Sequence, residues 1–256
     1  MKVKSDIEIN KMREGGKRLS AILRQVSMAV RVGMATEELD TLALGLISKG
    51  GDLPAFLHYK PEFSHRAFPA TLCVSINDEV VHGIPGKRIL LEGDIVGLDL
   101  GLEHEGLFVD MAVTVPVGIA SEADKRLMEA TGRSLKAGLA KVAPGVRLGD
   151  IGAEVERVVE TAGFSVVREL GGHGVGHEIH EPPFVPHFGP AGKGDKFELG
   201  QTICIEPMVS AGRAGVIFDQ QDGYTVRTAD GSRSAHYEVT LAVTDKGADI
   251  LTPIFW

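Results

Sequence analysis

The chain has 256 residues, of which 43% are hydrophobic and 24% are charged. This length is close to the limit at which one hydrophobic core still suffices, so we expect a single domain over residues 1–256. The formal net charge of -8 argues against binding to a nucleic-acid backbone, and no run of basic residues provides a local exception.

The cysteine content and the N-terminal sequence bear on the compartment. Cys73 and Cys204 lie in apolar stretches without CxxC spacing, so neither a disulfide framework nor a zinc knuckle is indicated. The N-terminus lacks the apolar core of a signal peptide, and no stretch approaches the ~18 uninterrupted apolar residues of a membrane span. We therefore expect a cytoplasmic protein that does not contact a membrane.

Four stretches carry apolar residues at the spacing of a helix. They cover residues 7 to about 32, 36–50, 121 to shortly before 144, and 150 to about 162. Ser121 and Asp124 form a capping-box pattern at the start of the third stretch. Residues 31–51 also resemble residues 143–164 at an offset of 112. A duplication would build two similar halves with a site between them, whereas coincidence among amphipathic helices would give the same similarity.

The remaining segments read as strands and loops. Strands are expected at residues 70–76, 164–167, 202–212 and 236–244, an irregular aromatic stretch at 56–69, and a polar loop with His82 at 77–86. The most informative segment is a hairpin over residues 93–117, in which two apolar runs each carry one aspartate, Asp99 and Asp110. Folding it about His104 and Glu105 places the two aspartates directly opposite each other.

Directly opposed like charges destabilise a sheet, so this pair of aspartates needs an explanation. One is a slipped register that points one carboxylate to solvent. The other is a pair of divalent metal ions, which two-metal hydrolases hold about 3.5–4 Å apart with bridging carboxylates.

Three further segments offer metal ligands among apolar neighbours, and they contain His173, Glu206 and Glu238. Glu206 has an alternative role as an edge-strand residue that faces water. Four carboxylates with one imidazole suit Mn, Fe, Co or Zn in a catalytic dinuclear site better than a structural zinc. Of the other histidines, His180 is favoured for function and His177 is a candidate solvated loop residue. Surface or structural roles are expected for the rest, which are His58, His65, His104, His187 and His236.

Over nearly its whole length the chain resembles the type I methionine aminopeptidases. The resemblance rests on NDEVVHGIP with His82, the hairpin with Asp99 and Asp110, GHGVGHEIHEPP with His173 and His180, TICIEPMV with Glu206, and SAHYEVTLAVT with Glu238. It implies an α+β pita-bread fold, in which a curved antiparallel sheet is flanked by helices. Two pseudo-symmetric halves of this fold would surround a dinuclear metal site.

The resemblance also implies roles for the candidate ligands. Asp99 would chelate one of two divalent cations (Co, Mn, Fe or Zn), and Asp110 and Glu238 would bridge the pair. His173 and Glu206 would complete the coordination of the second cation. Glu206 would in addition act as a catalytic residue that moves a proton.

The resemblance further implies how substrate is held. His82 and His180 would contact the substrate as catalytic and substrate-binding residues. A thioether pocket would be lined by Phe68, Cys73, Ile179 and Tyr224. Two of these depart from the family pattern, because Ile179 stands where Phe is common and Tyr224 where Trp is usual.

The function implied is removal of the initiator methionine from peptides and nascent chains when the second residue is small. We expect a monomer, and a transient association with the ribosome is compatible with this role. One alternative is a proline-specific (Xaa-Pro) aminopeptidase or dipeptidase on the same fold. Such relatives usually carry a large N-terminal domain, whereas only 98 residues precede Asp99, although Ile179 resembles them. The other alternative is a non-catalytic peptide-binding relative, which would be expected to have lost ligands that this chain keeps.

Overall fold

The computed structural model of the chain describes residues 3–61 and 66–256. The helices are α1 (Asp6–Ala29), α2 (Thr36–Gly50), α3 (Glu122–Leu139) and α4 (Leu148–Thr161). The strands are β1 (Leu53–Pro54), β2 (Leu72–Ile76), β3 (Glu79–Val81), β4 (Ile95–His104), β5 (Leu107–Pro116), β6 (Ser165–Val166), β7 (Gly172–Gly174), β8 (Glu181–Val185), β9 (Thr202–Ile205), β10 (Met208–Ser210), β11 (Val216–Phe218), β12 (Val226–Thr228), β13 (Ser234–His236), β14 (Glu238–Thr244) and β15 (Gly247–Ile250). The expected α+β class is confirmed.

Local capping decides where the helices begin. The Ser5 side chain accepts a hydrogen bond from the backbone of Glu8, and the Glu8 carboxylate accepts one from the backbone of Ser5, so α1 begins with a capping box. At α3 the Ser121 side chain accepts from the backbone of Asp124, as the sequence predicts. The first helix ends at Ala29, before the predicted end near residue 32, because Val30 already has an extended ψ of 126°.

The main sheet is antiparallel and joins the two halves of the chain. Its strand order is β1-β4-β5-β14-β9-β7-β8, with β2 also paired to β4 and β15 to β14. The halves meet where β5 pairs with β14, with Glu238 opposite Ala112 and Val239 opposite Met111. Side chains at this junction are therefore supplied by strands distant in sequence.

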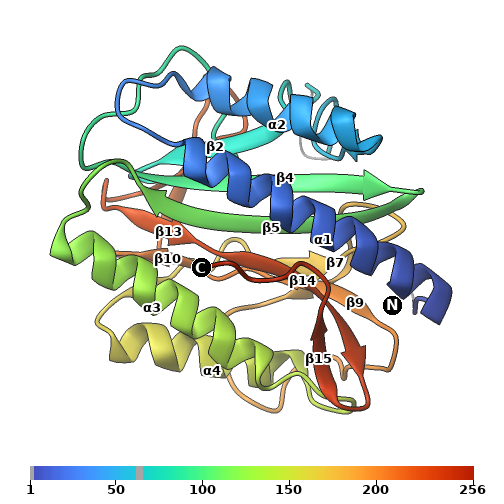
Figure 1. Ribbon diagram of the computed structural model, residues 1–256. Helices are drawn as coiled ribbons and strands as arrows, with labels where there is room; N and C mark the ends of the chain where they lie inside the picture. Colours follow the sequence, from blue (N-terminus) through green and yellow to red (C-terminus); the bar gives the residue numbers. More distant parts are fainter. Residues whose placement is uncertain (1–2, 62–65) are drawn as a thin grey trace.

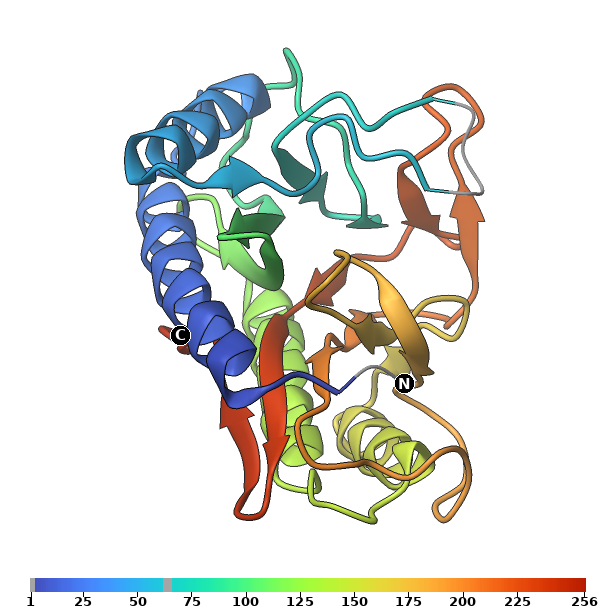
Figure 2. The ribbon, with the colours of Figure 1, turned by 90° about the vertical axis from the view of Figure 1, so that its right-hand side faces the viewer.

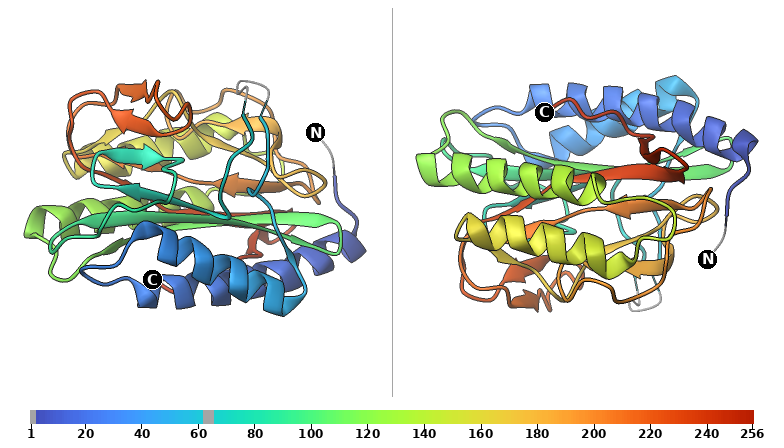
Figure 3. Two further views of the ribbon diagram at one scale, coloured as in Figure 1. Left: turned by 90° about the horizontal axis from the view of Figure 1, so that it is seen from above. Right: turned by 90° about the horizontal axis from the view of Figure 1, so that it is seen from below.

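The helices lie on one face of this sheet (Figure 1). Helix α1 packs across β4 and β5, with α2 beside it, and α3 packs on α4 and against β13. The side view shows the α1 and α2 pair on one side and the loops after β1 and around β11 and β12 on the other (Figure 2). Seen from above and below, the two helix pairs cover different parts of the sheet (Figure 3). The opposite face is thus left to strands and loops.

The similarity between the two halves extends to their local structure. Helices α2 and α4 begin at Thr36 and Leu148, which are 112 residues apart, the offset found in the sequence. Each follows an isolated bridge, from Ala35 to Ile89 and from Arg147 to Lys196. Two helix pairs in matching positions agree with the duplication and not with chance amphipathic similarity.

The core is formed by apolar side chains from both halves. One cluster of buried residues extends from α1 and α2 through β2, β4, β5, β9 and β14 to α3 and α4. Both cysteines are buried and neither forms a disulfide, which agrees with the lack of a CxxC motif. Among the described residues, we find no helix that combines the length and the apolar character needed to cross a bilayer.

Candidate metal centre

Four carboxylates and one imidazole meet where the two halves of the sheet join. Atoms of Asp99 (β4), Asp110 (β5) and Glu238 (β14) that could bind a metal lie within 4.8 Å of one another. The His173 Nε2 atom, on β7, is 3.4 Å from Glu206 Oε1 and 3.8 Å from Glu238 Oε1. The structure therefore brings together the five residues singled out in the sequence.

The predicted register of the hairpin is wrong by two residues. Asp99 pairs with Ala112 and Asp110 with Gly101, so the aspartates are diagonal neighbours and not directly opposed. The reason is the turn, which is formed by Glu105 and Gly106 with φ of 49° and 80°, a two-residue turn in which both residues need positive φ. A shift of two residues keeps both side chains on one face, and both line the same cavity, which excludes the solvent-facing alternative.

The proximity of the carboxylates changes their acidity. Burial, together with the charges of neighbouring carboxylates, holds the pKa values of Asp99, Glu206 and Glu238 well above their ordinary values. Burial raises the pKa of Asp110 to about 7, although the backbone N–H of Met111 opposes this shift. Glu206 is only 7% exposed, so the alternative of a water-facing edge residue is excluded. Without a compensating positive charge, this cluster carries strong repulsion at neutral pH.

Several polar atoms of the cluster lack a partner in the described part of the chain. Buried Asp99 Oδ1, Glu206 Oε1 and Glu238 Oε1 accept no hydrogen bond there. His173 Nδ1 lies 2.9 Å from the carbonyl of Gly174, so its Nδ1–H donates to the backbone and the Nε2 lone pair faces the carboxylates. Burial lowers the pKa of His173 to about 4, which keeps the imidazole neutral and able to bind a metal. Oxygen-rich ligands with one imidazole suit borderline divalent cations, so the residues fit such ions.

A cavity of about 580 Å³ opens directly beside the carboxylates. Its wall includes Phe68, Cys73 and Tyr224 of the predicted pocket, and Phe68 and Tyr224 meet edge to face at 5.2 Å. Ile179 is buried beside Gly101, and its place in the pocket stays a prediction. Its neighbour His180 lines the cavity.

The two histidines expected to contact substrate line this cavity. The Nδ1 atom of His180 is 3.0 Å from the Tyr59 hydroxyl, and its ring lies 4.5 Å from that of His173. Burial, with repulsion from His173 and His82, holds the pKa of His180 well below its ordinary value. Burial also lowers the pKa of His82 to about 4. Both imidazoles are therefore neutral at pH 7.

The backbone at His82 is held tightly against β2. His82 has a φ of 60°, and the next residue, Gly83, donates its N–H to Ser75 Oγ at 3.1 Å. The Gly83 carbonyl accepts from the backbone of Val74 at 2.8 Å. A Cβ atom at Gly83 would lie 2.2 Å from the carbonyl oxygen of Val74, so glycine is required for this close approach.

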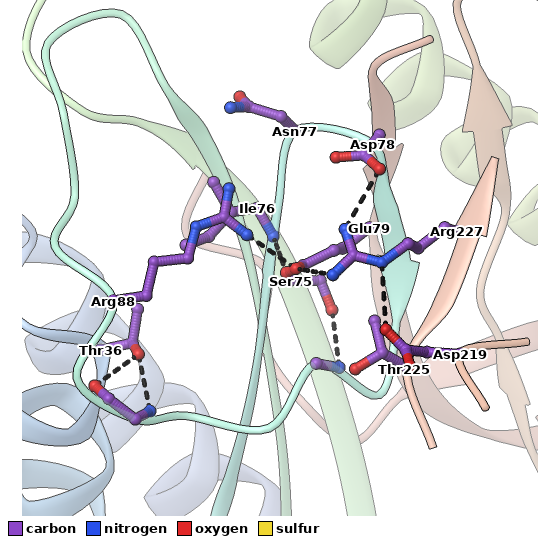
Figure 4. A network of polar contacts seen from close by, with 12 residues as sticks. Thr36, Ser75, Ile76, Asn77, Asp78, Glu79, Arg88, Asp219, Thr225 and Arg227 are labelled. Atoms are coloured by element: carbon purple, nitrogen blue, oxygen red, sulfur yellow. Dashed lines mark hydrogen bonds and ion pairs between the residues drawn. The ribbon is translucent and has the colours of Figure 1, made fainter. Parts of the chain in front are cut away.

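A network of charged residues holds β3, which ends just before His82 (Figure 4). The carboxylate of Glu79 accepts from the backbone of Ile76 at 2.7 Å, from Arg88 at 2.7 Å and from Arg227 at 2.8 Å. Because Arg227 lies on β12, the network ties the strand before His82 to the hairpin of β11 and β12, which lies beside the cavity. Three converging bonds on one buried carboxylate fix its position strongly.

Comparisons with known proteins agree with this geometry. A profile of metallopeptidase family M24 matches residues 10–245. The chain belongs to family M24. It is 42% identical to "Methionine aminopeptidase 1" from Bacillus subtilis over 251 residues, with 98% of each chain covered. Among solved structures, methionine aminopeptidase from Rickettsia prowazekii has a TM-score of 0.95 at 35% identity, with 99% of this chain and 100% of that chain covered. The one from Thermotoga maritima has a TM-score of 0.94 at 40% identity, with 99% and 100% covered.

These similarities confirm the pita-bread fold and the metallopeptidase class of this M24 member. The prolidase from Pyrococcus furiosus also shares the fold, with a TM-score of 0.80, but at 19% identity and with only 66% of that chain covered. At such low identity the likeness concerns the fold alone. The roles of the individual site residues in this M24 chain stay predictions.

Sequence reasoning missed several residues around the M24 site. His187 accepts a hydrogen bond from the backbone of Glu206 at its Nε2 atom, at 3.1 Å, and His236 Nε2 lies 3.5 Å from Glu206 Oε2. Phe56 and Tyr59 line the cavity, although their stretch has no periodicity. Of the remaining histidines, His104 is buried with its Nδ1 atom 2.7 Å from Asp52, His177 is paired with Glu8, His58 is exposed, and His65 lies outside the described residues.

Proposed function

We propose that this chain removes the N-terminal methionine from peptides and proteins whose second residue is small. The observation that carries the proposal is an apolar and aromatic cavity wall directly beside the carboxylate cluster. The high identity to proteins named methionine aminopeptidase supports the same reaction. The cleaved bond would lie between the cluster and the two neutral histidines.

In this proposal the five clustered residues hold two divalent cations. Asp99 would hold one cation, His173 and Glu206 would hold the other, and Asp110 and Glu238 would serve both. Such cations supply Lewis acidity toward a carbonyl oxygen and lower the pKa of water that they bind. The buried carboxylate oxygens without a partner support this assignment, because bound cations would pair with them. The raised pKa values support it as well, because the ionised form of these carboxylates needs a positive charge nearby.

Glu206 is the proposed proton carrier. Its carboxylate is buried, faces the cavity, and has a pKa held well above the ordinary value by burial and by neighbouring Asp110 and Asp99. It can therefore take the proton of the attacking water and deliver it to the leaving amine. His187 keeps the backbone of this residue in place through the bond to its N–H.

The methionine side chain would lie against Phe68, Cys73 and Tyr224. A thioether is flexible and polarizable and contacts ring edges and sulfur favourably. The Tyr224 hydroxyl donates to the carbonyl of Arg66, so its polar end is occupied by the backbone and its ring faces the cavity. A tyrosine at this position therefore gives an apolar wall, despite its departure from the family pattern.

Four peptides test the proposal against the proline-specific and non-catalytic alternatives. With Mn²⁺ or Co²⁺ added, we expect Met-Ala-Ser to be cleaved about 10²-fold faster than Met-Leu-Ser, because a bulky second residue displaces the carbonyl and about 1 Å of displacement has such an effect. Leu-Ala-Ser should be slower by about 10- to 200-fold, the usual value of a small change in an apolar pocket. Initial rates of released amino acid give the ranking.

Each alternative predicts another outcome for this panel. Preference for Ala-Pro-Ala over Met-Ala-Ser would contradict the methionine proposal and favour the proline-specific one. Binding of Met-Ala-Ser without cleavage, in protein that contains its metals, would favour the non-catalytic relative.

Replacing His82 or His180 by Ala should lower kcat/KM by about 10²–10³-fold while the bound metal stays unchanged. Neutral imidazoles that donate a hydrogen bond to the developing oxyanion have effects of this size. Metal per chain is measured by elemental mass spectrometry. His58→Asn is the matched control, since His58 is exposed, has a φ of 66°, and Asn tolerates positive φ. Loss of metal in His82→Ala would assign His82 to the ligands instead.

A further inference from the structure

The N-terminal segment lies against the loop that carries His180. Val3 forms an isolated bridge with Gln201, and the N–H of Lys4 donates to the carbonyl of Gly200 at 2.8 Å. These contacts place the Lys4 side chain under the loop. Its Nζ atom lies 2.7 Å from Glu181 Oε2, and the two side chains are only 1% and 2% exposed.

Glu181 directly follows His180 and closes the turn that precedes it. Its Oε1 atom accepts from the backbone N–H of His177 at 2.5 Å and from that of Glu178 at 3.0 Å. The other carboxylate oxygen is held by Lys4. Because one side chain makes all three bonds, the rotamer that Lys4 imposes on Glu181 also determines the shape of the turn.

The apolar stem of Lys4 fits closely below the same loop. A Cβ atom at Gly176 would lie 2.3 Å from Lys4 Cε, and Gly176 has a φ of +142°. The carbonyl of Gly176 accepts from the backbone of Phe108 on β5 at 2.8 Å. The loop therefore starts at a glycine that is packed on Lys4 and bonded to the central hairpin.

A second contact joins the loop to helix α1. His177 Nε2 lies 2.7 Å from Glu8 Oε1, and Glu8 also forms the capping box of α1 with Ser5. This pair is partly exposed, with side-chain exposures of 36% and 32%. The loop is thus held from below by a buried ion pair and from the side by a more exposed one.

On its cavity side, the loop presents His180 to Tyr59 and His173. The Nδ1 atom of His180 meets the Tyr59 hydroxyl at 3.0 Å, and this contact leaves Nε2 as the ring atom for other partners. The contact orients the imidazole ring, but it does not determine how far the His180 backbone lies from the carboxylates. That distance depends on the turn that Glu181 closes.

We propose that Lys4 is a positioning residue, whose buried ion pair with Glu181 sets the place of His180 in the cavity. A buried ion pair contributes little net stability, because desolvation offsets the attraction, and it is better suited to fixing one conformation. Removing one partner leaves a buried charge unpaired, so the turn must open toward water. A displacement of His180 of about 1 Å would then lower the rate by up to about 10²-fold.

The test compares Lys4→Met with Lys11→Met in chains loaded with Mn²⁺. Met keeps the length and the apolar character of the lysine stem and removes the charge. Lys11 lies on α1 and pairs with Glu105 at 3.1 Å, but its side chain is 42% exposed, so it is the matched control. We expect Lys4→Met to lower kcat/KM for Met-Ala-Ser by about 10- to 100-fold with metal content unchanged, and Lys11→Met to change it less than twofold.

A double-mutant cycle separates positioning from general damage. In a His180→Ala background, Lys4→Met should lower the remaining activity less than twofold, because the group that it positions is gone. An equal loss in both backgrounds would overturn the proposal. A crystal structure of Lys4→Met gives a reading independent of activity: the contact between His180 and Tyr59 should be lost, and an unmoved ring would overturn the proposal.

His177→Ala covers the case in which Lys4→Met does not fold. This variant removes the partly exposed contact with Glu8 and the longer approach of His177 Nδ1 to Glu181 Oε1 at 3.9 Å. We expect a two- to fivefold loss of kcat/KM that disappears in the His180→Ala background. No loss, or the same loss in both backgrounds, would count against the proposal. The inference rests on the proposed function for the assay only. An inactive wild-type chain would contradict that function, whereas an active wild type with an unaffected Lys4→Met chain and an unmoved His180 would contradict this inference alone.

Discussion

Glu206→Gln should lower kcat for Met-Ala-Ser by about 10²–10⁴-fold, the usual contribution of a positioned general acid and base. The substitution keeps the shape of the side chain and the Oε1 atom that faces His173 at 3.4 Å. It removes the ability to take up a proton at neutral pH. The backbone bond from Glu206 to His187 is unaffected, so the position of the residue should persist.

Two measurements make this result interpretable. Metal per chain is determined by elemental mass spectrometry, since an amide is a weaker ligand than a carboxylate, and rates are compared at equal metal content. Glu198→Gln is the matched control, because Glu198 is exposed on the segment that leads to β9, and it should change kcat less than twofold. A Glu206→Gln chain with normal metal content and near-normal turnover would remove Glu206 from the mechanism.

The sequence sufficed to predict that these carboxylates come together, because each position is strongly constrained. Asp99, Asp110 and Glu238 each interrupt an apolar strand, and a buried carboxylate without a partner needs an explanation. Strand alternation then places them on the sheet face toward the cavity. This reasoning depends only on whether a register shift is even or odd, because an even shift keeps each side chain on the same face. It therefore holds although the predicted register was wrong by two residues.

The register itself depended on turn chemistry that the sequence left ambiguous. Glu105 adopts a φ of 49°, a conformation that a non-glycine residue seldom takes, so a turn over Glu105 and Gly106 was not the obvious choice. The side-chain direction of Ile179 was open for a related reason. Its loop has no regular period, and the direction of each side chain there follows from the turn closed by Glu181.

The residues missed entirely came from segments without a pattern. Phe56 and Tyr59 lie in an irregular stretch, and only tertiary contacts bring them to the cavity wall. His187 and His236 were expected to be surface or structural residues, yet both contact Glu206. A lone histidine in a sequence gives no sign of which distant carboxylate it will meet.

Removal of the metal ions should abolish activity and make the stability of the chain depend on pH through the carboxylate cluster. Activity should fall below detection after exhaustive chelation and return with Mn²⁺ or Co²⁺, because the proposed reaction needs the cations. Activity that survives chelation would exclude them from the mechanism.

The pH dependence follows from the direction of the pKa shifts. Without metal, the folded chain holds the pKa of Asp110 at about 7 and those of Asp99, Glu206 and Glu238 well above ordinary values, whereas the unfolded chain has ordinary values near 4. The stability contributed by the protonated Asp110 carboxyl is therefore fully present below about pH 4 and is lost as pH rises through about 7, and the other three carboxyls act in the same direction.

Metal ions should reverse this loss. At pH 8 they neutralise ionised carboxylates, whereas at pH 5 they compete with protons, so the increase in Tm on adding Mn²⁺ should be larger at pH 8 than at pH 5. Asp110→Asn isolates the cluster from other titrating groups. In the metal-free state at pH 8, it should raise Tm by about 2–4 °C for each kcal/mol of the cost of burying the Asp110 charge that it removes, with a smaller effect at pH 5. Differential scanning calorimetry of both chains, with and without Mn²⁺, measures these differences. An equal metal-induced shift at pH 5 and pH 8 would show that these carboxylates do not carry the charge that the cations neutralise.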